Sequence, residues 1–184
     1  MTPIDRLVRE LGAADRAARE TAAAELYELG VALGDSVANA WRADREFVAL
    51  TAGPPTVGVA VWPHQFERIR QACGEPRLAD VPPDQDAREF ELHFGAARLD
   101  ILTSEGQPGA IAGYLEKFGE GIQQVELPVS DVGRATETLR KRFGVKPIYP
   151  DTRAGADGTR VNFFLAANAD GKKVLIELVE AAGK

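Results

Sequence analysis

Residues 120–132, Glu-Gly-Ile-Gln-Gln-Val-Glu-Leu-Pro-Val-Ser-Asp-Val, decide the fold. Apolar side chains alternate with polar ones, which predicts a strand over 122–129, and Asp131 stands where a following helix needs an N-cap. One face of this strand must pack on that helix. Gln124 and Glu126 occupy the other face. Because an amide or a carboxylate is costly to bury alone, these side chains need other strands, a metal ion or water beside them.

The composition excludes several classes of protein. A chain of 184 residues, 45% of them apolar, can bury one core and a small second unit. The net charge of -6 argues against a nucleic-acid surface, which needs clustered basic residues. A single cysteine, Cys73, rules out a disulfide framework and a thiolate metal cluster. No apolar run approaches a membrane span and no basic leader opens the chain, so we expect a cytoplasmic protein.

Residues 1–52 have helical patterns and are predicted to form an extension outside the main domain. Thr2 with Asp5 predicts a capped first helix that ends at Gly12. A second helix is expected from Asp15 to Gly30, and a third over about 36–50. These helices pack either on the main domain or on a second copy of the chain, which leaves a homodimer open.

The remaining residues, 53–184, begin after a breaker cluster at 51–55 and predict an α+β domain. Its first module, about 53–104, has strands expected at 56–61, 78–81, 87–94 and 98–103 and a helix starting near residue 63. Its second, about 119–184, follows a helix at 110–118 and has strands expected at 122–129, 146–149, 160–166 and 173–180 and a helix at 131–143. Aligning 56–61 with 124–129 matches three apolar positions, which indicates an internal duplication. We therefore predict paired βαβββ modules.

Side-chain alternation predicts which residues lie on the face of each sheet away from the helices. These residues are Thr56, Glu91, His93, Asp100, Gln124, Glu126, Asn162, Phe164 and Glu177. Asp100, Gln124 and Glu177 form an oxygen-rich set that suits Mg, Mn or Ca, and suits Co or Zn less well. Arg153 and Arg160 flank a glycine-bearing loop and are candidates to meet a carboxylate or a phosphate.

Four segments resemble one known family. They are Ala-Ile-Ala-Gly-Tyr-Leu-Glu-Lys-Phe-Gly-Glu-Gly-Ile-Gln-Gln-Val at 110–125, the helix after Asp131, Gly-Thr-Arg-Val-Asn-Phe at 158–163 and Val-Leu-Ile-Glu-Leu-Val-Glu at 174–180. The family is methylmalonyl-CoA epimerase, of the vicinal oxygen chelate (glyoxalase) superfamily. The resemblance is specific over about 110–180, weak over 55–104 and absent before 53. It implies paired βαβββ modules around a divalent metal.

The resemblance also implies roles for individual residues. The family's usual metal ligands, His, Gln, His and Glu, fall at Thr56, Asp100, Gln124 and Glu177. Without imidazole, the expected site binds Co, Mn, Mg or Zn through oxygen atoms or binds no metal. Glu91 matches the family's acid and is the expected proton shuttle, with Glu177 serving the opposite face of the substrate. Thr56, His93, Arg160 and Asn162 are the expected substrate-binding residues.

Two functions remain open from the sequence. The first is a metal-dependent, epimerase-like isomerase that moves the proton α to the thioester of an acyl-CoA of the methylmalonyl-CoA type. The second is a metal-free member of the same fold that binds a small molecule or a partner without catalysis. Thr56 favours the second function, whereas Asp100, Glu91 and Glu177 together favour the first. Neither function involves a nucleic acid or a membrane.

Overall fold

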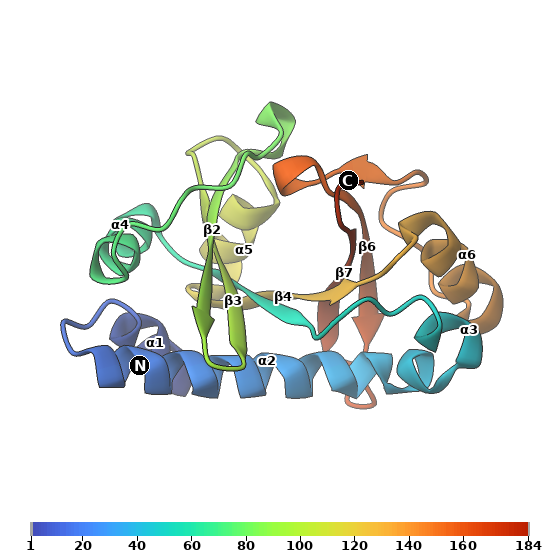
Figure 1. Ribbon diagram of the computed structural model, residues 1–184, viewed down its shortest axis with the longest axis horizontal. Coiled ribbons are helices and arrows are strands. Elements are labelled where there is room, and N and C mark those ends of the chain that lie inside the picture. Colours follow the sequence, from blue (N-terminus) through green and yellow to red (C-terminus); the bar gives the residue numbers. More distant parts are fainter. Residues whose placement is uncertain (1, 184) are drawn as a thin grey trace. The chain divides into compact units, whose positions relative to one another are not determined.

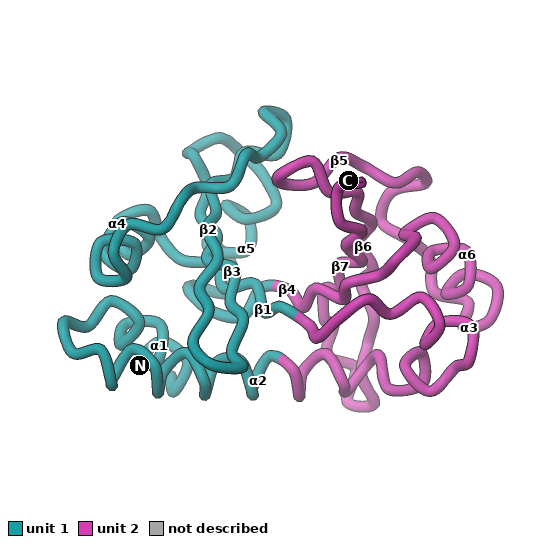
Figure 2. The backbone as a smooth tube through the Cα atoms, in the orientation of Figure 1, with its two compact units in different colours: residues 1–30, 56–123 teal, residues 31–55, 124–184 magenta. Residues whose placement is uncertain are grey.

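The computed structural model describes residues 2–183, and the chain divides into two compact units. Unit 1 comprises residues 1–30 and 56–123, and unit 2 comprises residues 31–55 and 124–184, coloured teal and magenta in Figure 2. The first 55 residues are therefore divided between the units after Gly30. None of the helices in the described range is both long enough and apolar enough to span a membrane.

Unit 1 contains these elements: α1 (Pro3–Glu10), the first part of α2 (Arg16–Ala43), β1 (Thr56–Ala60), α4 (Pro63–Ala72), the 3-10 helix η1 (Pro83–Gln85), β2 (Ala87–Phe94), β3 (Ala97–Ser104), α5 (Ala110–Phe118) and the start of β4 (Gly121–Pro128). Unit 2 contains the rest: the second part of α2, α3 (Arg45–Val48), most of β4, α6 (Val132–Phe143), β5 (Arg153–Ala154), the 3-10 helix η2 (Ala156–Gly158), β6 (Arg160–Ala167) and β7 (Lys173–Glu180) (Figure 1). The α+β fold class predicted from the sequence is confirmed.

The two units share one pattern of strand pairing. In unit 1, β1 pairs in parallel with β3, and β3 pairs antiparallel with β2. In unit 2, β4 pairs in parallel with β7, and β7 pairs antiparallel with β6. The short β5 adds to the far side of β6. The first strand of each unit thus lies beside its last strand, as an internal duplication requires.

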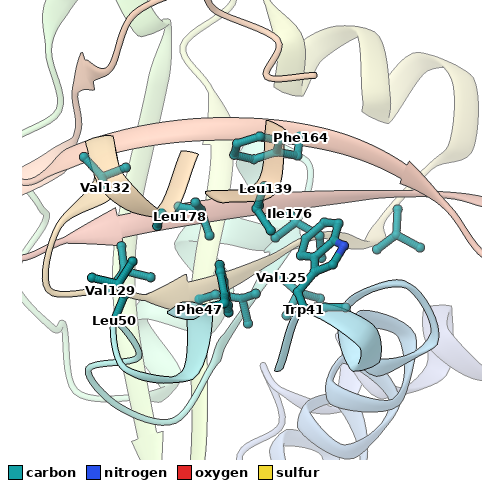
Figure 3. Close-up of a cluster of buried hydrophobic side chains, with 14 residues drawn as sticks. Trp41, Phe47, Leu50, Val125, Val129, Val132, Leu139, Phe164, Ile176 and Leu178 are labelled. Atoms are coloured by element: carbon teal, nitrogen blue, oxygen red, sulfur yellow. The ribbon is translucent and has the colours of Figure 1, made fainter. Parts of the chain in front are cut away.

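Each unit buries one face of its strands under helices. In unit 1, Phe66 of α4 meets Phe90 of β2 edge to face, with ring centroids 4.8 Å apart. In unit 2, Trp41 of α2 meets Phe164 of β6 with centroids 6.4 Å apart. Figure 3 shows Trp41, Phe164, Leu139 and Ile176 gathered in one apolar cluster. Burial of these side chains fixes which face of each strand remains for polar groups.

Three sequence predictions about elements are wrong. The expected second and third N-terminal helices are one helix, because α2 runs without a break from Arg16 to Ala43. Within it, the Ser36 hydroxyl donates to the Leu33 carbonyl oxygen, 2.6 Å away, instead of capping a new helix. Residues 78–81 form no strand, although the amide of Ala79 donates to the carbonyl of Glu89 in β2.

The third wrong prediction is the strand at 146–149, which forms a single bridge between Pro147 and Phe164. Proline has no amide hydrogen for a ladder, and this explains why pairing stops there. The two-residue strand β5 pairs with β6 instead, further along the chain.

Gly30 does not end a helix; it lets α2 approach β1. A Cβ atom at Gly30 would lie 2.4 Å from Cγ1 of Val57, and one at Gly34 would lie 2.9 Å from Cγ1 of Val125. The two glycines are one helical turn apart, and each meets the first strand of its own unit. The sequence signal that suggested a C-cap therefore reflects close packing of helix on strand.

We predict that Gly30→Ala lowers the free energy of unfolding by up to about 2 kcal/mol. The clash with Val57 costs about 1–3 kcal/mol as overpacking, and it outweighs the gain of about 1 kcal/mol in helix propensity. The matched control is Gly113→Ala in α5, where a Cβ would meet nothing within 4 Å, and this change should be stabilising. Urea denaturation measures the free energy of unfolding of both variants.

The same substitution made in a Val57→Ala variant tests whether the contact with Val57 is the cause. In Val57→Ala, the substitution Gly30→Ala should destabilise much less, because the two methyl groups are gone and only the Cβ atom, 3.0 Å away, remains close. An equal loss of stability in both backgrounds would show that the close approach at Val57 is not the cause.

Candidate functional site

Three polar side chains of unit 2 form a hydrogen-bonded cluster on β4 and β7. Glu126 and Glu177 are partners in the parallel register, and Gln124 lies two residues before Glu126 on the same face. The amide nitrogen Nε2 of Gln124 donates to Glu177 Oε2 at 2.5 Å and to Glu126 Oε1 at 3.2 Å. Gln124 and Glu177 each keep only 8% of their surface exposed. We call the face that carries these three residues the carboxylate face of unit 2.

The cluster has the chemistry of a site for a hard cation. Two neighbouring carboxylates repel, and the Gln124 amide hydrogens stabilise them from one side. A glutamine amide can also turn over and present its oxygen in place of its nitrogen. Gln124, Glu126 and Glu177 would then offer three oxygen atoms, the ligand type that Mg²⁺, Mn²⁺ and Ca²⁺ prefer. Residues 2–183 hold no group of three His, Cys, Asp or Glu side chains placed for a metal.

Unit 1 carries a second polar face on β1, β2 and β3. Asp100 of β3 lies opposite Gly58 of β1 and Glu91 of β2 in the strand register. Asp100 is buried, with 7% of its surface exposed, whereas the Glu91 side chain is 69% exposed. Thr56, two residues before Gly58, shares this face by alternation and is half-buried. The predicted shared face of Thr56, Glu91 and Asp100 is therefore confirmed.

His93 lies two residues beyond Glu91 and bonds to it. Its Nε2 atom is 3.0 Å from Glu91 Oε2, and the histidine side chain is 52% exposed. An exposed pair of this kind contributes little to stability. Its geometry nevertheless lets the imidazole orient the carboxylate of Glu91.

The two polar faces correspond position by position. Asp100 and Glu177 occupy the same place in the last strands of their units, and Thr56 and Gln124 the same place in the first strands. The place of Glu91 in unit 1 is taken in unit 2 by Phe163, which pairs with Glu177. At this equivalent position, unit 1 has a carboxylic acid, Glu91, and unit 2 has an aromatic ring, Phe163.

The predicted faces of Asn162 and Phe164 are wrong. Asn162 pairs with Leu178 and Phe164 with Ile176, and both partners belong to the apolar core of unit 2. Asn162 is fully buried, and its Oδ1 accepts from the amide of Phe163 at 2.9 Å. The adjacent phenylalanines Phe163 and Phe164 make alternation ambiguous in the sequence, and the register places the second of them in the core.

Arg160 lies on the same side of β6 as Asn162. It is opposite Glu180 in the register, and Nη1 of Arg160 lies 3.7 Å from Glu180 Oε2. Its Nη2 atom donates to the Thr152 hydroxyl at 2.9 Å, and Glu180 also accepts from the amide of Val132 at the start of α6. Arg160 therefore has a structural role on the face opposite Glu177.

The structure adds residues that the ligand prediction missed. Glu126 was assigned to the correct face but not to the metal set, and its pairing with Glu177 could be read only from the register. Phe163 and the Tyr149 ring beside it, with centroids 6.1 Å apart, extend the carboxylate face of unit 2. Arg153 covers Tyr149, with its Cζ atom 4.5 Å from the ring centroid.

Searches against protein-family models and against curated proteins found no match. Among solved structures, the chain is similar to the methylmalonyl-CoA epimerase of Mycobacterium tuberculosis, with 33% identity, a TM-score of 0.60, and coverage of 73% of this chain and 91% of that one. A variant of the Streptomyces coelicolor methylmalonyl-CoA epimerase in complex with 2-nitronate-propionyl-CoA matches at 28% identity and a TM-score of 0.60, over 73% of this chain and 99% of that one.

A third similar structure is a methylmalonyl-CoA epimerase in complex with methylmalonyl-CoA and NH4+, at 25% identity and a TM-score of 0.58, with 73% of this chain and 96% of that one covered. These matches agree with the element order and with the repeated strand pairing of the two units. The chain therefore has the vicinal oxygen chelate fold, the fold of its epimerase neighbours.

Proposed function

We propose that this protein is a metal-dependent isomerase of the epimerase kind, which moves the proton α to the thioester of an acyl-CoA such as methylmalonyl-CoA. The observation that carries the proposal is the hydrogen-bonded cluster of Gln124, Glu126 and Glu177, in which Gln124 and Glu177 are buried. Its place on paired first and last strands is the place where the resemblance to the epimerases puts metal ligands. The similar solved structures with acyl-CoA ligands support the choice of substrate class.

Gln124 and Glu177 are the proposed metal ligands of unit 2, with Glu126 beside them. In unit 1 the proposed ligand is Asp100, whose buried carboxylate is the counterpart of Glu177. A bound divalent cation would supply stabilisation of the negative charge that develops on the thioester oxygen. All of these donors are oxygen atoms, which favours Mg²⁺ or Mn²⁺ over metals that prefer nitrogen.

Proton transfer is assigned to two carboxylates. The resemblance to the epimerases gives Glu91 of unit 1 the role of proton shuttle, and it gives Glu177 of unit 2, or a water beside it, the role of the second proton-transfer group. His93 Nε2 lies 3.0 Å from the Glu91 carboxylate and favours one orientation of it. Inversion needs one acceptor and one donor on opposite sides of the carbon, so both groups are required.

The second candidate function is metal-free binding of a small molecule. It is favoured by the position of the Gln124 amide, whose nitrogen can donate to both carboxylates and stabilise them without a metal. Thr56 also stands where the epimerases commonly have a histidine ligand. The two candidates differ in their response to divalent cations, which can be measured without any substrate.

We predict that Gln124→Glu makes the protein more responsive to Mg²⁺ or Mn²⁺. Three carboxylates on one face repel, so stability should fall without a cation and recover when one binds. At a concentration 100 times the dissociation constant, the cation should stabilise by about 2.7 kcal/mol. Thermal unfolding with and without the ion measures this effect.

Gln123→Glu is the matched control for that experiment. Gln123 is the neighbouring residue on β4 and, by alternation, points to the opposite face. Its Oε1 atom is buried, so Gln123→Glu should lower stability equally with and without the ion. It should not acquire a cation-dependent gain in stability. Equal responses of the two variants would mean that the carboxylate face of unit 2 does not bind the ion.

We predict further that Glu177→Gln and Asp100→Asn each reduce divalent-metal uptake at least tenfold, whereas Glu91→Gln leaves uptake unchanged. In deuterated water, Glu91→Gln should retain less than about 1% of the wild-type exchange of the methylmalonyl-CoA α-proton, since general acid–base groups contribute about 10²- to 10⁴-fold. Proton NMR follows the exchange, and Glu67→Gln on α4 is the surface control.

These measurements separate the two functions. Wild-type protein that takes up no divalent ion and exchanges no α-proton would favour the metal-free binding function. If Glu91→Gln still exchanges the α-proton, the protein is an enzyme but Glu91 is not its proton shuttle.

A further inference from the structure

Arg153 shares the carboxylate face of unit 2. It pairs with Val161 in the antiparallel register of β5 and β6, and Val161 in turn pairs with Val179 of β7. Residues directly opposite one another in antiparallel strands point to the same face, so Arg153 lies on the side of Phe163 and Glu177. Arg160, the other arginine that flanks the glycine-bearing loop, is one register step away and on the other side.

Aromatic stacking orients the Arg153 guanidinium. Its Cζ atom lies 4.5 Å from the centroid of the Tyr149 ring, and that ring meets Phe163 edge to face at 6.1 Å. Phe163 is the register partner of Glu177. The two ring contacts therefore connect the arginine to Phe163, the residue opposite the buried carboxylate in the strand register. Because the guanidinium is planar and stacked, its donors are held in one plane, the geometry that a carboxylate or phosphate accepts.

Gly155 keeps this part of the chain close to the sheet. A Cβ atom at Gly155 would lie 2.6 Å from Cγ1 of Val161 and 2.4 Å from Oγ1 of Thr159. The amide of Gly155 also donates to the carbonyl of Thr159 at 2.9 Å. The turn that follows β5 is thus packed directly on β6, so Arg153 has a defined position.

The spacing suits a small acyl group. Arg153 and Glu177 are two strands and two residues apart, which places their Cα atoms roughly 12 Å apart. The long arginine side chain spans part of that separation, and the remainder is comparable to the length of a short acyl chain. Glu126 and Glu177 make this face negative, so an anionic ligand there needs a cation to offset the repulsion.

We propose that Arg153, stacked on Tyr149, binds an anionic oxygen of the substrate on the carboxylate face of unit 2 and thereby selects acyl-CoA thioesters by charge. This inference rests on the proposed function, because it assumes an acyl-CoA substrate. The oxygen belongs to the carboxylate of the acyl group or to a phosphate of CoA, which are the two anionic parts of such a molecule. Both accept paired hydrogen bonds from a guanidinium.

The test is calorimetric binding of three compounds to wild type and to Arg153→Met. Methylmalonyl-CoA carries both kinds of anion, propionyl-CoA carries the phosphates alone, and methylmalonyl-pantetheine carries the carboxylate alone. Loss of a charge-assisted pair should weaken binding about 10- to 100-fold. Weaker binding of the two methylmalonyl compounds alone identifies the carboxylate, and weaker binding of the two CoA esters alone identifies a phosphate.

Two further variants separate binding from folding. Arg160→Met removes the cation on the opposite face and should leave the affinities unchanged. Tyr149→Leu keeps the guanidinium but removes its stacking partner, so it should weaken the same compounds as Arg153→Met to a smaller extent. Urea denaturation of each variant shows whether the fold is intact.

The outcomes also distinguish this inference from the proposed function. Unchanged affinities in folded Arg153→Met, or a wild-type protein that binds none of the three compounds, would overturn the role of Arg153. Wild type that binds in an Arg153-dependent manner but exchanges no α-proton would keep that role and refute the epimerase activity. Proton exchange with no effect of Arg153→Met on binding would keep the activity and refute the role.

Discussion

Two carboxylates, Glu126 and Glu177, lie side by side on parallel strands, and the surrounding structure must stabilise them. The Gln124 amide does so by donating to both. This arrangement requires the last strand of unit 2 to pair with the first in one register, because a slip of one residue would turn Glu177 into the apolar core. Packing of Ile176, Leu178 and Phe164 against Trp41 and α6 fixes that register from the other face (Figure 3).

The duplication gives two copies of one scaffold with different chemistry. Pairing of the first with the last strand brings Asp100 beside Gly58 in unit 1 and Glu177 beside Glu126 in unit 2. On the neighbouring strand, unit 1 presents Glu91 with His93, whereas unit 2 presents Phe163 with Tyr149 and Arg153. We interpret the first set as suited to moving protons and the second as suited to holding a ligand. A fold repeated within one chain allows this division because each copy keeps its own core.

Much of the local structure follows from the sequence, because alternation and capping are short-range signals. The strands at 87–94 and 173–180 and the helix at 110–118 have the predicted bounds. The predictions failed where a local signal had a tertiary cause. Gly30 marks the contact of α2 with Val57 and not a helix end, and the expected strand near Pro147 is a single bridge.

The sequence by itself determined the α+β class, the duplication and the polar faces that carry Asp100, Gln124 and Glu177. These depend on periodicity within single elements, which alternation of side chains records directly. Only the tertiary structure decided that Glu126 joins Gln124 and Glu177, that Asn162 and Arg160 lie on the opposite face, and that Arg153 shares the face of Glu177. Those facts depend on the register between strands far apart in the chain. Register is set by the packing of the whole core, and no single segment of the sequence contains that information.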